Sequence, residues 1–146
     1  MLYKLANSEE VASFHPELQN TAWTSLVALS EKVDDSRKDL EFENLIPELC
    51  HQLRQKLPDP TKEELYFRQQ ALLVLANASL RSYLRPMITA NDGVQIFVDA
   101  ILGKSKYDFG DSILAKRVAA KGLMNLALSK KEVRQNVVGQ LTEVIE

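Results

Sequence analysis

Apolar residues recur every three or four positions through most of the chain, and the strict alternation of a half-buried strand is almost missing. One such series runs through residues 18–33 and another through residues 42–57. Because a helix places residues three and four apart on one face, these series predict amphipathic helices. The chain is therefore expected to form an all-α fold of about eight helices, several of them short.

Residue types that favour helix ends support the same segments. Pro16 and Pro47 suit the first position of a helix, where a missing N–H leaves no helical partner unsatisfied. Thr61 followed by Glu64 makes a capping box after the break at residues 57–60. These signals predict that helices begin near residues 16, 47 and 61.

Similar signals divide the second half of the chain. Residues 91–93, Asn-Asp-Gly, mark a turn into a further helix, and residues 103–111 form the one long polar loop. A helix is predicted from about residue 112 to residue 129. Ser129 with Glu132 makes another capping box, so a last helix is expected beyond it.

Two apolar patterns repeat along the chain in alternation. The first pattern occurs as Leu26, Leu29 and Ser30, as Leu72, Leu75 and Ala76, and as Leu123, Leu126 and Ala127. The second occurs as Ile46, Leu49, Cys50 and Leu53, as Val94, Phe97, Val98 and Ile101, and, in part, as Leu141, Val144 and Ile145. The offsets between copies are 46 to 51 residues. They predict helical units that stack on their neighbours and share a core.

These repeated segments resemble the armadillo repeat, and the related HEAT repeat less well. The third armadillo helix is similar to "AAKGLMNLA" (119–127) and to "RQQALLVLA" (68–76), and the second to "GVQIFVDAI" (93–101) and "LIPELCHQL" (45–53). Pro47 falls at the proline position of that second helix. The resemblance covers about residues 16–146 and implies a right-handed α-solenoid of about three divergent repeats. We expect residues 1–146 to form one such domain, either complete or as a piece of a longer solenoid.

Departures from the armadillo pattern argue against nuclear-import cargo binding. In armadillo proteins of that class, a Trp and an Asn four residues later repeat along the groove. The Trp position is occupied here by Thr24, Gln70 and Lys121, and the Asn position by Ala28, Val74 and Asn125. Only Asn125 matches, so recognition of import signals is not expected.

A short polar stripe is the candidate binding site. Arg117, Lys121 and Asn125 are four residues apart, on the side that faces the groove in armadillo proteins. The preceding unit would contribute Tyr66 and Gln70 beside them, together with a valine. The resemblance therefore implies that a partner segment of acidic character lies against these five residues. A merely solvated cationic face is an equally weighted reading.

Composition and charge exclude several function classes. Residues 1–65 carry seven Lys or Arg and thirteen Asp or Glu, a net charge of −6, whereas residues 66–146 carry eleven and seven, a net charge of +4. That excess is too thinly spread for nucleic-acid binding. No secretory leader or membrane-spanning stretch is apparent, and a lone cysteine, Cys50, suits the cytoplasm or the nucleus.

No constellation of catalytic or ligand-binding residues is present. The five glycines are too scattered for a phosphate-binding loop, and two histidines 36 residues apart with one cysteine give no zinc-ligand spacing. Cys50 aligns with apolar positions of the repeat, so a buried role is expected for it. We therefore expect no cofactor, no metal and no enzymatic activity.

The leading hypothesis is a non-enzymatic protein interaction module or scaffold that binds a peptide or helix of a partner in its concave groove. The alternative is a chaperone-type or exchange regulator that clasps a folded partner, as armadillo-like regulators of myosin, Hsp70 or small GTPases do. The partner is expected to be a protein, not a nucleic acid or a membrane. The last helix starts at Leu141 with its apolar face incomplete, so self-association through it is also open.

Overall fold

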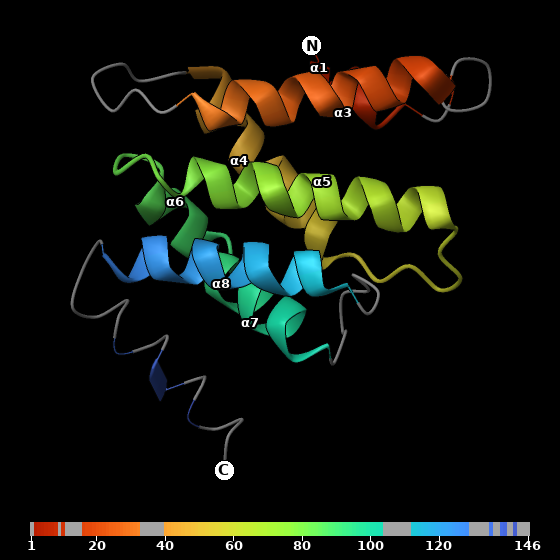
Figure 1. Ribbon diagram of the computed structural model, residues 1–146. Helices are drawn as coiled ribbons and strands as arrows, with labels where there is room; N and C mark the ends of the chain where they lie inside the picture. Colours follow the sequence, from red (N-terminus) through yellow and green to blue (C-terminus); the bar gives the residue numbers. More distant parts are fainter. Residues whose placement is uncertain are drawn as a thin grey trace.

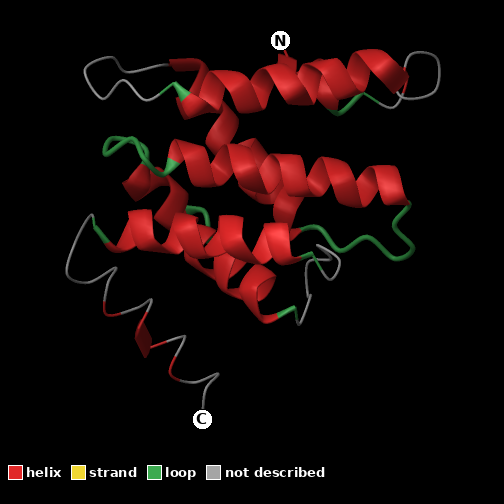
Figure 2. Ribbon diagram, in the orientation of Figure 1, coloured by secondary structure: helices red, strands yellow, loops and turns green. Residues whose placement is uncertain are grey.

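The computed structural model describes residues 2–8, 10, 16–32, 40–103, 112–128, 135, 138–139 and 142. All regular structure in this part of the chain is helical, which confirms the predicted all-α class (Figure 2). The helices are α1 (Leu2–Ala6), α3 (Pro16–Glu31), α4 (Leu40–Arg54), α5 (Lys62–Ala78), α6 (Arg85–Ala90), α7 (Gly93–Leu102) and α8 (Ile113–Ala127).

Most predicted helix starts are confirmed. Helix α3 begins at Pro16. Thr61 caps α5, because its Oγ1 accepts a hydrogen bond from the Glu64 N–H at 3.1 Å. Ser112 caps α8 in the same way, since its hydroxyl accepts from the Ala115 N–H at 3.3 Å. The predicted box at residues 129–132 lies outside the described residues.

The prediction that Pro47 begins a helix is wrong. Pro47 lies inside α4, which begins at Leu40. A proline in a helix interior costs about 3 kcal/mol, but Phe42, Leu45 and Ile46 on the turn before it are buried. Burial of each such side chain contributes roughly 1.5–3 kcal/mol, so continuing the helix through Pro47 is favoured.

The predicted turn at residues 91–93 is confirmed, and it brings α6 and α7 into very close contact. Asp92 adopts the left-handed conformation with a φ of 64°, and its carboxylate forms a 2.8 Å ion pair with Arg54 at the end of α4. Gly93 then begins α7 directly against Ile88. A Cβ atom on Gly93 would lie 2.3 Å from the Ile88 Cγ2 and 2.7 Å from its carbonyl oxygen.

The helices form two layers (Figure 1). Helices α3, α5 and α8 lie side by side in one row, with α5 between the other two. Helices α4, α6 and α7 contact one another behind that row, and α1 packs on α3. The first apolar pattern of the sequence therefore falls on the row, and the described copies of the second pattern fall on α4 and α7.

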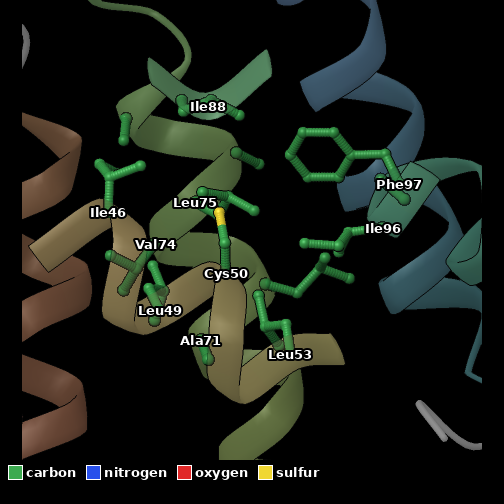
Figure 3. Packing of buried hydrophobic residues seen from close by; sticks show 14 of the residues in the cluster. Ile46, Leu49, Cys50, Leu53, Ala71, Val74, Leu75, Ile88, Ile96 and Phe97 are labelled. Carbon is green, nitrogen blue, oxygen red and sulfur yellow. The ribbon is translucent and has the colours of Figure 1, made fainter. Parts of the chain in front are cut away.

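The core fills the space between the two layers (Figure 3). Buried apolar side chains of α4 pack against others from α5, α6 and α7. The members labelled in the figure are Ile46, Leu49, Cys50 and Leu53 of α4, Ala71, Val74 and Leu75 of α5, Ile88 of α6, and Ile96 and Phe97 of α7. Cys50 is fully buried, as predicted. Desolvation raises the pKa of its thiol to about 12, so the reactive thiolate is strongly disfavoured.

A hydrogen-bonded pair of Ser and Asn joins each helix of the row to the next. The Asn77 amide donates to the Ser30 hydroxyl at 3.0 Å, and the Asn125 amide donates to the Ser79 hydroxyl, also at 3.0 Å. Each serine hydroxyl in turn donates to the backbone carbonyl three residues before it. The serines are 49 residues apart and the asparagines 48, close to the repeat spacing. Ser30 aligns with Ala76 and Asn125 with Val74 in the apolar repeat, so the two bonds join the helices at neighbouring positions of the units and not at equivalent ones.

Arginine side chains cover the ends of three helices, where backbone carbonyls lack helical partners. Arg81 is 4% exposed and donates to the Lys32 carbonyl at 2.6 Å, beyond the end of α3. Arg68 is 3% exposed and donates to the Leu53 carbonyl of α4 at 2.8 Å. Arg85 donates to the carbonyl of the residue that follows α5. Positive charge at a helix C-terminus is favourable, so these contacts stabilise the stack.

Candidate interaction surface

The row of helices α3, α5 and α8 presents one face away from the second layer. Residues at helical spacing on this face are exposed or half-buried; they are Glu17, Asn20, Thr24, Val27 and Glu31 on α3, Glu63, Tyr66, Gln70, Leu73 and Asn77 on α5, and Leu114, Arg117, Lys121, Met124 and Leu128 at α8. We call this set the outer face. Because the three helices lie side by side, it forms a continuous surface (Figure 1).

The structure places four of the five predicted site residues on the outer face. Arg117 and Lys121 are exposed on successive turns of α8, and Tyr66 is 45% exposed on α5. Gln70 is half-buried. Asn125 is placed differently, because it is only 9% exposed and its amide is bonded to the neighbouring helix.

Two sequence expectations about this face are therefore corrected. Val74, predicted beside Gln70, is fully buried and faces the core (Figure 3). Asn125, predicted to contact the partner segment, instead holds α8 against Ser79 of the preceding unit. The polar stripe on α8 thus consists of Arg117 and Lys121.

Charge changes sign across the outer face. Helix α3 carries Glu17 and Glu31 and no Lys or Arg, whereas residues 113–127 carry three basic residues and no acidic one. Within the described ranges, neither Arg117 nor Lys121 has an ion-pair partner. The α8 end of the face is therefore free to attract carboxylates.

Exposed apolar side chains on α8 were missed by the sequence analysis. Leu114, Met124 and Leu128 are 58%, 70% and 72% exposed, and Ile113 beside them is 69% exposed. The available signal was that apolar residues surround α8 on nearly every side, although only one side can face the core. Grouped apolar exposure of this kind is typical of interaction sites.

The hollows described in the structure lie beside α1, and none of the five predicted site residues lines them. One, of about 440 Å³, is lined by apolar side chains, among them Leu26, Phe42 and Leu45, together with the polar Lys4, Asn44 and Glu48. The other is lined by Tyr3, His51 and four further residues. Tyr3 lines both hollows, with its ring edge-on to Trp23 and its hydroxyl donating to Gln52 Oε1 at 2.6 Å. Burial raises the pKa of Tyr3 well above its usual range, so it stays a neutral donor.

The described part of the chain shows neither a cluster of metal ligands nor a membrane-spanning helix. In the described part of the chain, no three His, Cys, Asp or Glu side chains come together as metal ligands. None of its helices combines the length and the apolar character that crossing a bilayer requires. No family model matches the chain, and no match was found among the curated proteins or among the solved structures. The arrangement of the outer face is therefore what supports a function.

Proposed function

We propose that this chain is a non-enzymatic protein interaction module, a right-handed α-solenoid of about three divergent armadillo-like repeats. It binds a peptide or helix of another protein in its concave groove, which the armadillo resemblance places at the outer face. The observation that carries the proposal is the recurrence of one Ser-Asn bond between α3 and α5 and again between α5 and α8. A polar contact of the same kind thus joins each helix of the row to the next at similar spacing, which supports a stack of similar units, and such a stack presents a preformed surface.

Charge favours an acidic partner segment. Arg117 and Lys121 extend from α8 without partners among the described residues, and Tyr66 and Gln70 lie on the adjacent helix. A rigid surface of this kind loses little entropy on binding, so a modest number of contacts is enough for recognition. A cytoplasmic or nuclear location fits a chain whose described cysteine, Cys50, is free and buried.

A charge-reversal experiment tests the proposal. A random peptide library is selected on the immobilised chain, and the affinities of the selected peptides are measured by fluorescence anisotropy at several salt concentrations. Lys121→Glu is expected to weaken binding about tenfold or more, and rising salt is expected to weaken it further. Lys56→Glu makes the same charge change at an exposed residue outside the outer face and serves as the matched control. Selected peptides that bind Lys121→Glu as well as the unaltered chain would contradict the proposal.

A second candidate is a regulator that clasps a folded partner, of the kind that acts on myosin, Hsp70 or small GTPases. The observation that favours it is the hollow beside α1, with Leu26, Phe42 and Leu45 in its wall. Binding in this hollow would be insensitive to Lys121→Glu. A Leu29→Asp variant, at a residue of the wall that is 42% exposed, would abolish it and leave the outer face unchanged.

A further inference from the structure

One stripe of the outer face has the spacing of a helix-pairing seam. Its members follow one another at intervals of three, four, three and four residues and are Leu114, Arg117, Lys121, Met124 and Leu128. We call them the α8 seam. A mean interval of 3.5 residues is the period at which two helices keep one side turned toward each other along their length. The apolar members are 58–72% exposed, so no described residue covers this seam.

The same intervals on the neighbouring helices carry different side chains. On α5 the equivalent positions are Glu63, Tyr66, Gln70, Leu73 and Asn77, and on α3 they are Glu17, Asn20, Thr24, Val27 and Glu31. Those stripes are mainly polar and suit contact with water. Within this row, the α8 seam alone combines large exposed apolar side chains with basic ones.

The order of apolar and basic side chains along the seam restricts what can cover it. Leu114 lies at one end, Met124 and Leu128 lie at the other, and two cations lie between them. Covering Arg117 and Lys121 with apolar groups would remove unpaired charges from water, which is strongly unfavourable. Carboxylates opposite the two cations, with apolar side chains on both sides of them, complement the seam throughout.

We infer that the α8 seam binds an amphipathic helix of a partner protein, lying along α8, with two acidic residues between apolar ones. This rests on the proposed function and specifies its ligand. An extended segment running across the row would meet only one or two members of the seam, whereas a helix along α8 meets all five. The seam covers 15 residues, so the partner helix needs about four turns, with side chains in the order apolar, acidic, acidic, apolar, apolar, or the reverse.

Two synthetic peptides test this inference against the full chain. The acidic peptide has 15 residues, with Leu at positions 1, 11 and 15 and Glu at positions 4 and 8 in an alanine and glutamine background, matching the seam intervals. The basic peptide has Lys in place of both Glu residues. We expect the acidic peptide to bind at least about tenfold more tightly than the basic one. The double variant Arg117→Glu/Lys121→Glu should reverse that preference.

Further variants separate an along-helix contact from simple charge attraction. Met124→Ser should weaken the acidic peptide about tenfold without altering the preference between peptides. A version of the acidic peptide that keeps both Glu residues but has proline at one background position near its centre cannot pair as a helix. It should bind at least as weakly as the basic peptide. Lys56→Glu is the control for net charge, and circular dichroism of each variant checks the fold.

The outcomes distinguish this inference from the broader proposal. A reversed preference between the two peptides in the double variant, together with weaker binding of the acidic peptide by Met124→Ser, supports a helix on the seam. Equal binding of the helical and proline-containing peptides overturns the inference, but it leaves the outer face as a peptide site if library-selected peptides remain sensitive to Lys121→Glu. Absence of binding by the acidic peptide and by all selected peptides overturns both.

Discussion

The contact between Gly93 and Ile88 gives a sharp test of how the second layer is assembled. Gly93 begins α7, and a Cβ atom there would lie 2.7 Å from the Ile88 carbonyl oxygen, which is well inside van der Waals contact. The obstacle is backbone, so turning a side chain cannot relieve it. Gly93→Ala is therefore expected to force α7 away from α6.

The expected destabilisation follows from two opposing terms. Alanine is favoured over glycine in a helix interior by about 1 kcal/mol, and less at its first residue. Overpacking a filled core typically costs about 1–3 kcal/mol, and this site is fully packed, since Ile88 and Phe97 are completely buried. Steric cost outweighs propensity, so we expect a net loss of about 1–2 kcal/mol in the free energy of unfolding.

The assay is urea unfolding followed by far-ultraviolet circular dichroism and by the fluorescence of Trp23, which is fully buried. Gly139→Ala is the matched control, because a Cβ atom there meets nothing within 4 Å. We expect the control to leave the urea midpoint unchanged or to raise it. A Gly93→Ala protein as stable as the unaltered chain would refute the reasoning and would mean that α6 and α7 are not held this closely.

Three further predictions follow from buried polar and ionisable groups. Asn125→Ala leaves the Ser79 hydroxyl without its donor and should lower the free energy of unfolding by about 1–3 kcal/mol in the same urea assay; an unchanged midpoint would show that the bond is dispensable. Arg81→Met should lower the free energy of unfolding by about 2 kcal/mol or more, because it uncovers the carbonyls at the end of α3. A double variant with Phe42→Leu should show that the two substitutions are not additive, since the guanidinium carbon of Arg81 lies 4.5 Å from the centre of the Phe42 ring. Folding raises the pKa of the Cys50 thiol from 9.0 to about 12, so between these values the unfolded chain has lost the thiol proton that the folded chain retains. The free energy of unfolding should therefore fall by roughly 1.4 kcal/mol per pH unit above pH 9. Cys50→Ala should remove that part of the pH dependence.

Local signals in the sequence determine much of the fold. The starts of α3 and α5 were predicted because a proline or a capping hydroxyl acts within one turn of the helix it begins, and the start of α8 because a polar loop ends there. Pro47 misled the same reasoning, because burial of Phe42 and Ile46 depends on helices elsewhere in the chain. The short helices α1 and α6 have too few residues for a periodic pattern to be recognised.

The candidate surface was predictable in part for a similar reason. Periodicity correctly placed Arg117 and Lys121 on an exposed side of α8. It could not show that Asn125, at the edge of that stripe, turns inward, because its partner Ser79 lies 46 residues earlier on another helix. Nor could it show which side of the largely apolar α8 is left uncovered, since that depends on where α5 and α7 pack.

The Ser-Asn pairs also determine how the helices of the row are aligned lengthwise. Apolar side chains along neighbouring helices would pack almost as well after a shift of one helical turn, because such contacts have little directionality. A hydrogen bond between Ser30 and Asn77, or between Ser79 and Asn125, tolerates no such shift. An additional unit engineered between α5 and α8 should therefore keep the alignment if it supplies one serine and one asparagine at these positions, even with a differently composed apolar face.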